Sequence, residues 1–253
     1  MTDLKRRMRA GETLIGAFSD LASPLGVELL GNAGLDWIVL DLEHGSATEA
    51  DLLGLLHAVA TTPAAAIVRP QSGERLRIGR ALDLGAAGIM IPQMQSVDDV
   101  RVATSYLRYP PVGSRGVALR TRGAGMGALG HGDLARVVND RVVGIVQIES
   151  PNTAADADAI AALDEVDCLF VGPADLSHAL GIPGQFDDPA YLAALQGVVA
   201  ACRAHGKAAG ILIYDGAALA RHLDLGFTFV GLGSDGAYVS SGARAMLAAA
   251  GRS

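Results

Sequence analysis

Eight short runs of aliphatic and β-branched residues alternate along the chain with eight longer segments of helical periodicity. Continuous apolar runs are typical of strands buried on both faces, and strand–helix repetition gives parallel sheets with right-handed crossovers. Eight units predict an α/β fold: a (β/α)8 TIM barrel, forming one domain over residues 1–253. The predicted strands are Thr13–Phe18, Asp36–Asp41, Ala65–Arg69, Gly88–Ile91, Val142–Ile148, Cys168–Val171, Ala208–Ile213 and Phe227–Gly231.

An extra N-terminal helix, Asp3–Arg9, precedes the first strand, where it would cap the bottom of the barrel. A doubly wound sheet is the alternative fold, but the chain lacks a G-x-G-x-x-G turn after its first strand. Two long connections, Tyr109–Asp140 and Ser177–Asp188, are expected to be functional or interfacial. The helices predicted after the strands are Pro24–Ala33, Glu49–Ala60, Glu74–Leu84, Val97–Leu107, Thr153–Leu163, Pro189–His205, Gly216–Leu225 and Ser234–Ala250.

Composition narrows the function classes. A net charge of −7 is unlike the basic footprint of a nucleic-acid-binding protein. The N-terminus is charged and no apolar run reaches the length of a membrane span, so we expect a cytoplasmic protein without a membrane partner. Aromatic residues make up only 4% of the chain, which predicts a core filled by small aliphatic side chains. Cys168 and Cys202 form no CxxC or Cys/His motif and are expected to be buried thiols.

Polar residues follow five of the predicted strands, and in a TIM barrel these positions meet at one mouth. Taken singly, each has a structural explanation: Asp175 could cap a helix, Glu149 could face a helix dipole, and Asp41 could pair with Arg69. Taken together, so many charged groups at one mouth indicate a ligand, because unpaired buried charges are costly. The residues are Asp41, Glu43 and His44, then Arg69, then Gln147 and Glu149, then Pro173 and Asp175, then Ser234 and Asp235.

Six motifs follow one another along the chain: WIVLDLEHGS, VRP, ALDLGAAGIMIPQMQS, YPPVGSRG, VQIES and FVGPADLS. Together they resemble the HpcH/HpaI family of class II 2-oxo-acid aldolases. The resemblance implies a metal-dependent TIM-barrel enzyme, usually hexameric. Its reaction would join pyruvate or hydroxypyruvate reversibly to an aldehyde through a metal-stabilised enolate, giving a 4-hydroxy-2-oxo acid. The partners would be these small molecules and further copies of the chain.

The same resemblance implies roles for individual residues. Glu149 and Asp175 match the metal-binding carboxylates of the family. Arg69 matches its enolate-stabilising arginine. His44 matches its acid/base histidine, with Asp83 as the partner of that histidine.

The substrate side of the site has its own candidates. Gln147 matches the glutamine that faces the bound oxo acid. The backbone N–H groups that follow Pro173, at Ala174 and Asp175, could hold the substrate carboxylate. Ser234 lies in the glycine-rich turn after the eighth strand, which we expect to shape the pocket.

The residues themselves agree with a metal mechanism. Enolate charge is stabilised by a Schiff-base lysine or by a metal, and the only lysines, Lys5 and Lys207, lie outside the predicted mouth. The two proposed ligands are both carboxylates, a set suited to Mg²⁺, Mn²⁺ or Co²⁺. His44, with an unperturbed pKa near ~6.5, is suited to proton transfer near neutral pH.

Three other functions stay open. A related metal–enolate lyase or decarboxylase, acting on oxaloacetate or a citramalyl-type substrate, would use the same residues. A phosphate-binding TIM-barrel isomerase is suggested by GLGSDG after the eighth strand. A non-catalytic barrel is the third, although Arg69, Glu149 and Asp175 are all intact. The Ala-rich final helix and the Tyr109–Asp140 segment favour a homo-oligomer, and the resemblance implies a hexamer.

Overall fold

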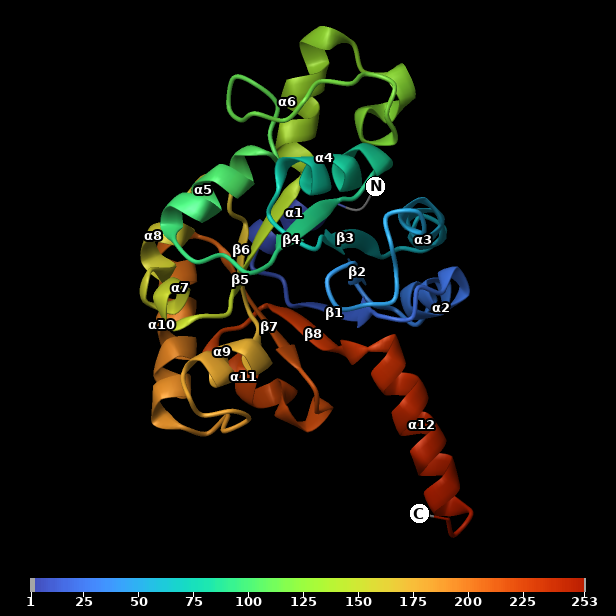
Figure 1. Ribbon diagram of the computed structural model, residues 1–253, viewed down its shortest axis with the longest axis vertical. Helices are drawn as coiled ribbons and strands as arrows, with labels where there is room; N and C mark the ends of the chain where they lie inside the picture. The colour runs from blue at the N-terminus through green and yellow to red at the C-terminus, as the bar shows by residue number, and fades with distance from the viewer. Residues whose placement is uncertain (1–2, 253) are drawn as a thin grey trace.

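The computed structural model describes residues 3–252 and shows a closed barrel of parallel strands in chain order, with β8 returning to β1 (Figure 1). The predicted TIM barrel with an extra N-terminal helix is therefore confirmed. Four predicted strand starts were early by one or two residues, and β8 extends further than expected, to Ser234. The strands are β1 Leu14–Ser19, β2 Trp37–Asp41, β3 Ala65–Arg69, β4 Gly88–Ile91, β5 Val143–Ile148, β6 Cys168–Val171, β7 Ala208–Ile213 and β8 Phe229–Ser234.

Helices surround the barrel, and most lie where the periodicity predicts them. The helix after β5 is split in two at Asp156. The Tyr109–Asp140 connection, read from the sequence as a loop, carries a 3-10 helix and most of a regular helix. The helices are α1 Leu4–Arg9, α2 Pro24–Asn32, α3 Leu52–Val59, α4 Arg75–Leu84, α5 Val97–Ser105, η1 Arg122–Gly127, α6 His131–Arg141, α7 Pro151–Ala155, α8 Ala157–Ala161, α9 Pro173–Ala179, α10 Pro189–His205, η2 Gly216–Ala218, α11 Leu219–Leu225 and α12 Asp235–Ala249.

The inside of the barrel corrects one expectation from composition. The clusters between strands and helices are mainly aliphatic, as predicted, but the interior holds four of the chain's few aromatic side chains. Trp37 stacks on Phe229 with ring centroids 4.2 Å apart, and Phe18 and Phe170 pack against this group. A Cβ at position 16 would lie 2.1 Å from the Trp37 ring, so Gly16 is what gives the indole its space.

Helix α1 closes the bottom of the barrel, as the sequence suggests. Leu4 and Met8 are buried in the interior cluster. Lys5 is also buried; its Nζ lies 3.1 Å from Asp167 and donates a hydrogen bond to the carbonyl of Val142. Both partners directly precede strands, so Lys5 lies at the end of the barrel opposite the strand termini that form the mouth.

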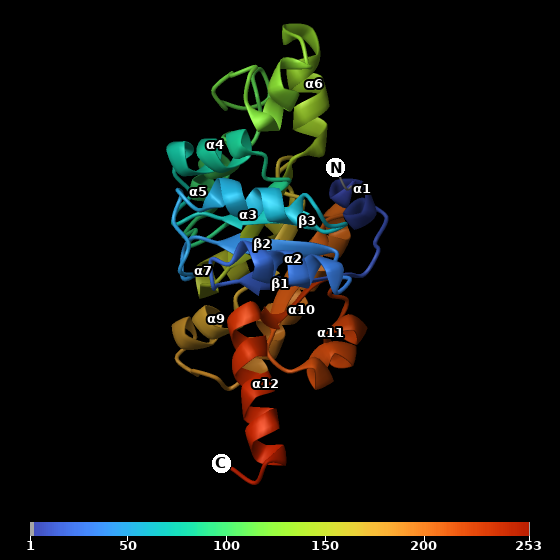
Figure 2. The ribbon, with the colours of Figure 1, turned by 90° about the vertical axis from the view of Figure 1, so that its right-hand side faces the viewer.

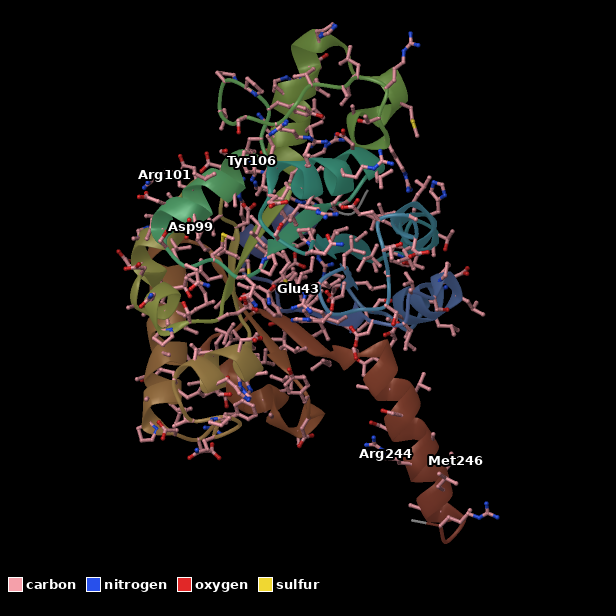
Figure 3. The ribbon with its side chains drawn as sticks, in the orientation of Figure 1. Glu43, Asp99, Arg101, Tyr106, Arg244 and Met246 are labelled. Atoms are coloured by element: carbon pink, nitrogen blue, oxygen red, sulfur yellow. The ribbon has the colours of Figure 1, made fainter. Side chains whose placement is uncertain are left out.

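Helix α12 leaves the barrel instead of packing along it (Figures 1 and 2). From Tyr238 onward nearly all of its residues are exposed, including Met246 at 73%. Arg244 and Met246 lie well away from the rest of the protein (Figure 3). Within residues 3–252 no helix is long and apolar enough to cross a membrane.

Candidate active site

Asp41 and Arg69 form the centre of the mouth. They are paired positions at the ends of β2 and β3, so the parallel register sets their side chains next to each other. Arg69 donates from Nε and from a terminal nitrogen to the two carboxylate oxygens of Asp41, at 2.8 and 2.7 Å. Asp41 is 1% exposed and Arg69 8%. The ion pair that the sequence left open as a structural explanation therefore exists, and it fixes the guanidinium in one orientation.

Glu43 and His44 follow Asp41 in a turn that Asp41 itself organises. The backbone N–H groups of both residues donate to Asp41 Oδ1. The other terminal nitrogen of Arg69 lies 3.2 Å from Glu43 Oε2. Burial raises the pKa of Glu43, and the nearby charge of Arg69 opposes that shift. Figure 3 shows Glu43 near the centre of the barrel, whereas the His44 side chain is 64% exposed and free to meet a substrate.

Glu149 is held at the end of β5 by three neighbours. Its Oε1 accepts a hydrogen bond from the Gln147 side chain at 2.7 Å, and its Oε2 accepts one from the backbone of Gln93 at 3.0 Å. Gln93 has a left-handed backbone with φ of 59°. A Cβ at Gly172 would lie 2.9 Å from Glu149 Cγ, so only glycine at this position leaves enough space for the Glu149 side chain. The geometry of Glu149 thus depends on β5 itself and on the segments that follow β4 and β6.

The pKa of Glu149 depends on its burial and on the charged groups around it. Burial raises the pKa of this carboxyl to about 7, and the charges of Asp175 and Glu43 add to the shift. The hydrogen bond from Gln93 and the charge of Arg69 act in the opposite direction. Because the charge of Asp175 raises the pKa of Glu149, a cation bound between these two carboxylates would relieve the repulsion.

The donor set fits a divalent cation. Gln147 is 2% exposed, and its Oε1 has no hydrogen-bond partner among residues 3–252. Asp175 lies in the first turn of α9, which starts at Pro173, so it is not the helix cap that the sequence allowed as an alternative. The described part of the chain contains no cluster of three His, Cys, Asp or Glu side chains arranged around a metal. Two carboxylates and water or substrate oxygens would then complete the coordination, as is usual for Mg²⁺.

The wall formed by β1 and β8 is also acidic. Asp235 is 5% exposed and accepts hydrogen bonds from the Ser19 hydroxyl, at 2.9 Å, and from the backbone of Asp20, at 2.7 Å. Ser234 caps α12 by accepting from the N–H of Ala237. Burial raises the pKa of Asp20, and a hydrogen bond with Ser234 opposes the shift. Ser234 therefore lies at the mouth, where its hydroxyl contacts the Asp20 carboxylate. A carboxylate at this position does not favour binding of a phosphate by the turn after β8.

One predicted pairing is not formed. Asp83 lies near the end of α4, which returns toward the bottom of the barrel, and its carboxylate accepts from Arg115 at 2.9 Å. His44 lies at the mouth, beside Glu43. The expected contact between His44 and Asp83 is thus not formed within a single chain, because a helix after a barrel strand carries its last residues away from the mouth. The partnership of the two residues stays a prediction.

Sequence reasoning missed two contributors. Gln93 acts through its backbone N–H and its left-handed conformation, and a motif containing it was noted without a role. Asp20 lies just beyond β1, whose end carried no charged residue in the predicted strand. Reading one or two residues past every strand would have included Asp20; no sequence signal marks the backbone of Gln93.

A closed barrel with buried Arg69 and two carboxylates at its mouth, and with both lysines at the opposite end, has the arrangement of a TIM-barrel enzyme. The family model described as HpcH/HpaI aldolase/citrate lyase matches residues 14–241. The chain belongs to this family, and the family assignment and the aldolase class expected from the sequence are confirmed.

Individual relatives agree over nearly the whole chain. The pyruvate aldolase of Rhizobium etli is 35% identical over 244 residues, 96% of this chain and 95% of the relative. The hydroxypyruvate/pyruvate aldolase of Pseudomonas aeruginosa is 38% identical over 91% of this chain and 86% of its own. A crystal structure of an HpcH/HpaI aldolase/citrate lyase family protein from Burkholderia cenocepacia J2315 superposes with a TM-score of 0.92 at 35% identity, covering 98% of this chain and 99% of that one.

Proposed function

We propose that this aldolase is metal-dependent and joins pyruvate or hydroxypyruvate reversibly to an aldehyde, giving a 4-hydroxy-2-oxo acid. The observation that carries the proposal is the mouth itself, where the rigid Arg69 guanidinium faces a carboxylate pair, Glu149 and Asp175. The names of two relatives support the choice of donor, since they are called pyruvate aldolase and hydroxypyruvate/pyruvate aldolase.

The metal would be held by Glu149 and Asp175, and Mg²⁺, Mn²⁺ and Co²⁺ all suit these oxygen ligands. When bound, it would supply Lewis-acid polarisation of the oxo-acid carbonyl. A Schiff base is disfavoured because Lys5 pairs with Asp167 and Lys207 donates to the carbonyls of Leu163 and Val166, both before β6.

Arg69 would stabilise the negative charge that develops on the carbonyl oxygen when the donor loses a methyl proton. Burial alone would lower the pKa of Arg69, but its hydrogen bonds and charge interaction with Asp41 raise it, so the guanidinium stays charged. Asp41 accepts from Nε and one terminal nitrogen, and Glu43 lies against the other terminal nitrogen. A guanidinium has five N–H groups, so each terminal nitrogen keeps one for an oxygen of the substrate.

His44 would move the proton on the hydroxyl group that is made or broken. Its exposed ring lies 3.8 Å from Glu43, at the rim of the mouth, where a substrate can reach it. The hydroxyl of the aldol product must lose a proton as the carbon–carbon bond breaks, and a histidine at the rim can accept it.

The donor's carboxylate would lie at the start of α9. In that helix the first internal hydrogen bond is from the N–H of Leu176, so the N–H groups of Ala174 and Asp175, after Pro173, point out of the helix. Gln147 would face the same molecule, because its buried Oε1 is unpartnered within the described chain. Ser234 would shape the far wall of the pocket through its contact with Asp20.

The protein would work as a homo-oligomer, and the family resemblance suggests a hexamer. Helix α12 carries exposed Val239, Met246 and Leu247 away from the barrel, an apolar surface that a monomer would leave in water. A pairing between His44 and Asp83 would also require a second copy, since one chain holds them at opposite ends. Light scattering should report an oligomer at micromolar concentration; a monomer would contradict this part of the proposal.

The test is a product analysis with purified protein. Pyruvate and a short aldehyde, incubated with Mg²⁺ or Mn²⁺, should give a 4-hydroxy-2-oxo acid detectable by NMR. The Glu149→Gln variant should form none. Decarboxylation of oxaloacetate without any aldol product would favour the related decarboxylase instead.

A further inference from the structure

A cavity lies outside the mouth, at the bottom of the barrel. It has a volume of about 760 Å³ and lies where strands β3 to β5 begin, between α3, α4, η1 and α6. Its walls are mostly apolar and include Leu56, Val59, Leu82, Leu129 and Val138. The size is typical of small-molecule sites in proteins.

Arg115 is the buried charge in this cavity. It is 3% exposed and stacks over the Tyr109 ring, with its guanidinium carbon 4.4 Å from the ring centroid. One terminal nitrogen donates to Asp83 at 2.9 Å. Its Nε is buried and meets no hydrogen-bond acceptor anywhere in residues 3–252. A buried guanidinium donor without an acceptor is costly unless something binds there.

Arg122 presents a second unused donor. One of its terminal nitrogens is buried and has no acceptor in the described structure. Its side-chain stem lies over Gly85, where a Cβ would come within 3.1 Å of Arg122 Cγ and Cδ. Gly85 has φ of 104°, which suits glycine and leaves room for the arginine. The stem is therefore held while the guanidinium is not satisfied.

The charge balance of the cavity is positive. Arg141 joins Arg115 and Arg122 in its lining, and no carboxylate belongs to the lining over the part of the chain described. Asp83, which lies outside the lining, pairs with only one of these three arginines, Arg115. The remaining charge and the apolar walls call for a ligand with an anionic end and an apolar body.

We propose that this cavity is a second ligand site, separate from the catalytic mouth, that binds a carboxylate with an apolar chain or ring. The carboxylate accepts hydrogen bonds from Arg115 Nε and the Arg122 guanidinium, and the body of the ligand packs against the apolar wall. Arg141, exposed at the end of α6, adds positive charge at the rim.

Isothermal titration calorimetry with hexanoate, acetate and hexanamide tests the site in the intact protein. Hexanoate should bind saturably. Acetate should bind on the order of 10²-fold more weakly, because each buried methylene contributes about 0.8 kcal/mol. Hexanamide should bind at least about 10-fold more weakly than hexanoate, because it lacks the charge that arginine recognises. Equal affinity for acetate and hexanoate would mean that the site reads charge alone and would overturn the proposal.

Variants locate the binding. Arg122→Met should weaken hexanoate binding by about 10- to 100-fold, the loss of one charge-assisted hydrogen bond. Arg136→Met is the matched control, because Arg136 is an exposed arginine on α6 that pairs with Asp133 and does not line the cavity. Ala128→Trp fills the cavity from an exposed lining position and should also abolish binding with little risk to folding.

The catalytic mouth is excluded by a further variant. Hexanoate binding should survive in Arg69→Met, while aldol activity without hexanoate should survive in Arg122→Met. Loss of hexanoate binding in Arg69→Met would show that the ligand occupies the mouth. Equal binding in Arg122→Met and wild type, or no saturable binding to wild type, would overturn the second site. These results do not depend on which oxo acid the enzyme uses, so failure here is distinguishable from failure of the proposed function.

Discussion

Arg69 donates two hydrogen bonds to Asp41, the residue paired with it on the neighbouring strand. The contact fixes the guanidinium at the ends of β2 and β3, at the mouth of the barrel. In Arg69→Ala both aldol cleavage and exchange of pyruvate methyl protons with D₂O should fall on the order of 10²–10³-fold, the usual loss for one oxyanion donor. Proton NMR in D₂O measures both rates, and unchanged exchange would show that the enolate site is assigned wrongly.

Asp41→Asn tests the orientation of Arg69 rather than its charge. The amide keeps the shape of Asp41 but supplies one acceptor oxygen instead of two, so the bidentate pair becomes a single bond. We expect kcat to fall about 10-fold or more with a smaller change in KM, because positioning errors act mainly on the reacting centre. A variant in which only KM changes would assign Asp41 to substrate binding instead.

His44→Ala separates the two halves of the reaction. Cleavage should fall on the order of 10²–10⁴-fold, as for loss of a general acid or base. Exchange of pyruvate methyl protons should fall much less if another group takes the methyl proton. His57→Ala is a control, since His57 lies on α3 outside the mouth. Equal losses of cleavage and exchange would assign both protons to His44.

The pKa of Glu149 predicts a pH-dependent stability. The folded state raises this pKa from 4.5 to about 7, so the folded protein binds the proton more tightly than the unfolded chain. Ionising Glu149 therefore costs stability as the pH rises from about 4.5 through about 7, on the order of 3 kcal/mol in total. Urea unfolding in EDTA should show Glu149→Gln to be more stable than wild type at pH 8, and equally stable at pH 4. A wild type that is the more stable protein at pH 8 in EDTA would contradict the assigned burial.

Gly172→Ala tests how Glu149 is held. The new methyl group would meet Glu149 Cγ at 2.9 Å, so the carboxylate must move. Affinity for Mg²⁺ should fall about 10- to 100-fold, the usual effect of disturbing a ligand's support. Gly197→Ala is the matched control: it lies within α10 with nothing within 4 Å of a Cβ, and it should leave metal affinity unchanged. Equal affinities in the two variants would show that Glu149 tolerates the shift.

Much of this architecture could be predicted from the alternation of short apolar runs with longer helical segments. The β3 segment Ala65–Arg69 and the β7 segment Ala208–Ile213 were predicted to the residue, because buried parallel strands are continuous apolar runs with clear ends. The residues at the mouth followed from the rule that strand ends carry the chemistry. Arg69 and Glu149 lie there as predicted.

Other features depend on tertiary contacts that a sequence pattern does not record. Asp83 matched a motif, but helix direction carries it away from His44, and its observed partner, Arg115, is 32 residues away in the chain. The four aromatic residues that fill the barrel were hidden by a low average aromatic content. Gln93 holds Glu149 through its backbone N–H, and a pattern of side chains in the sequence does not reveal a backbone contact.

Pyruvate proton exchange in D₂O, followed by NMR with and without metal, tests the central claim most directly. Wild type treated with EDTA should lose exchange, and added Mg²⁺ or Mn²⁺ should restore it. Glu149→Gln and Asp175→Asn should stay inactive at metal concentrations that restore wild type. Full exchange by metal-free wild type would contradict the account, and so would full recovery of both variants at the same metal concentration.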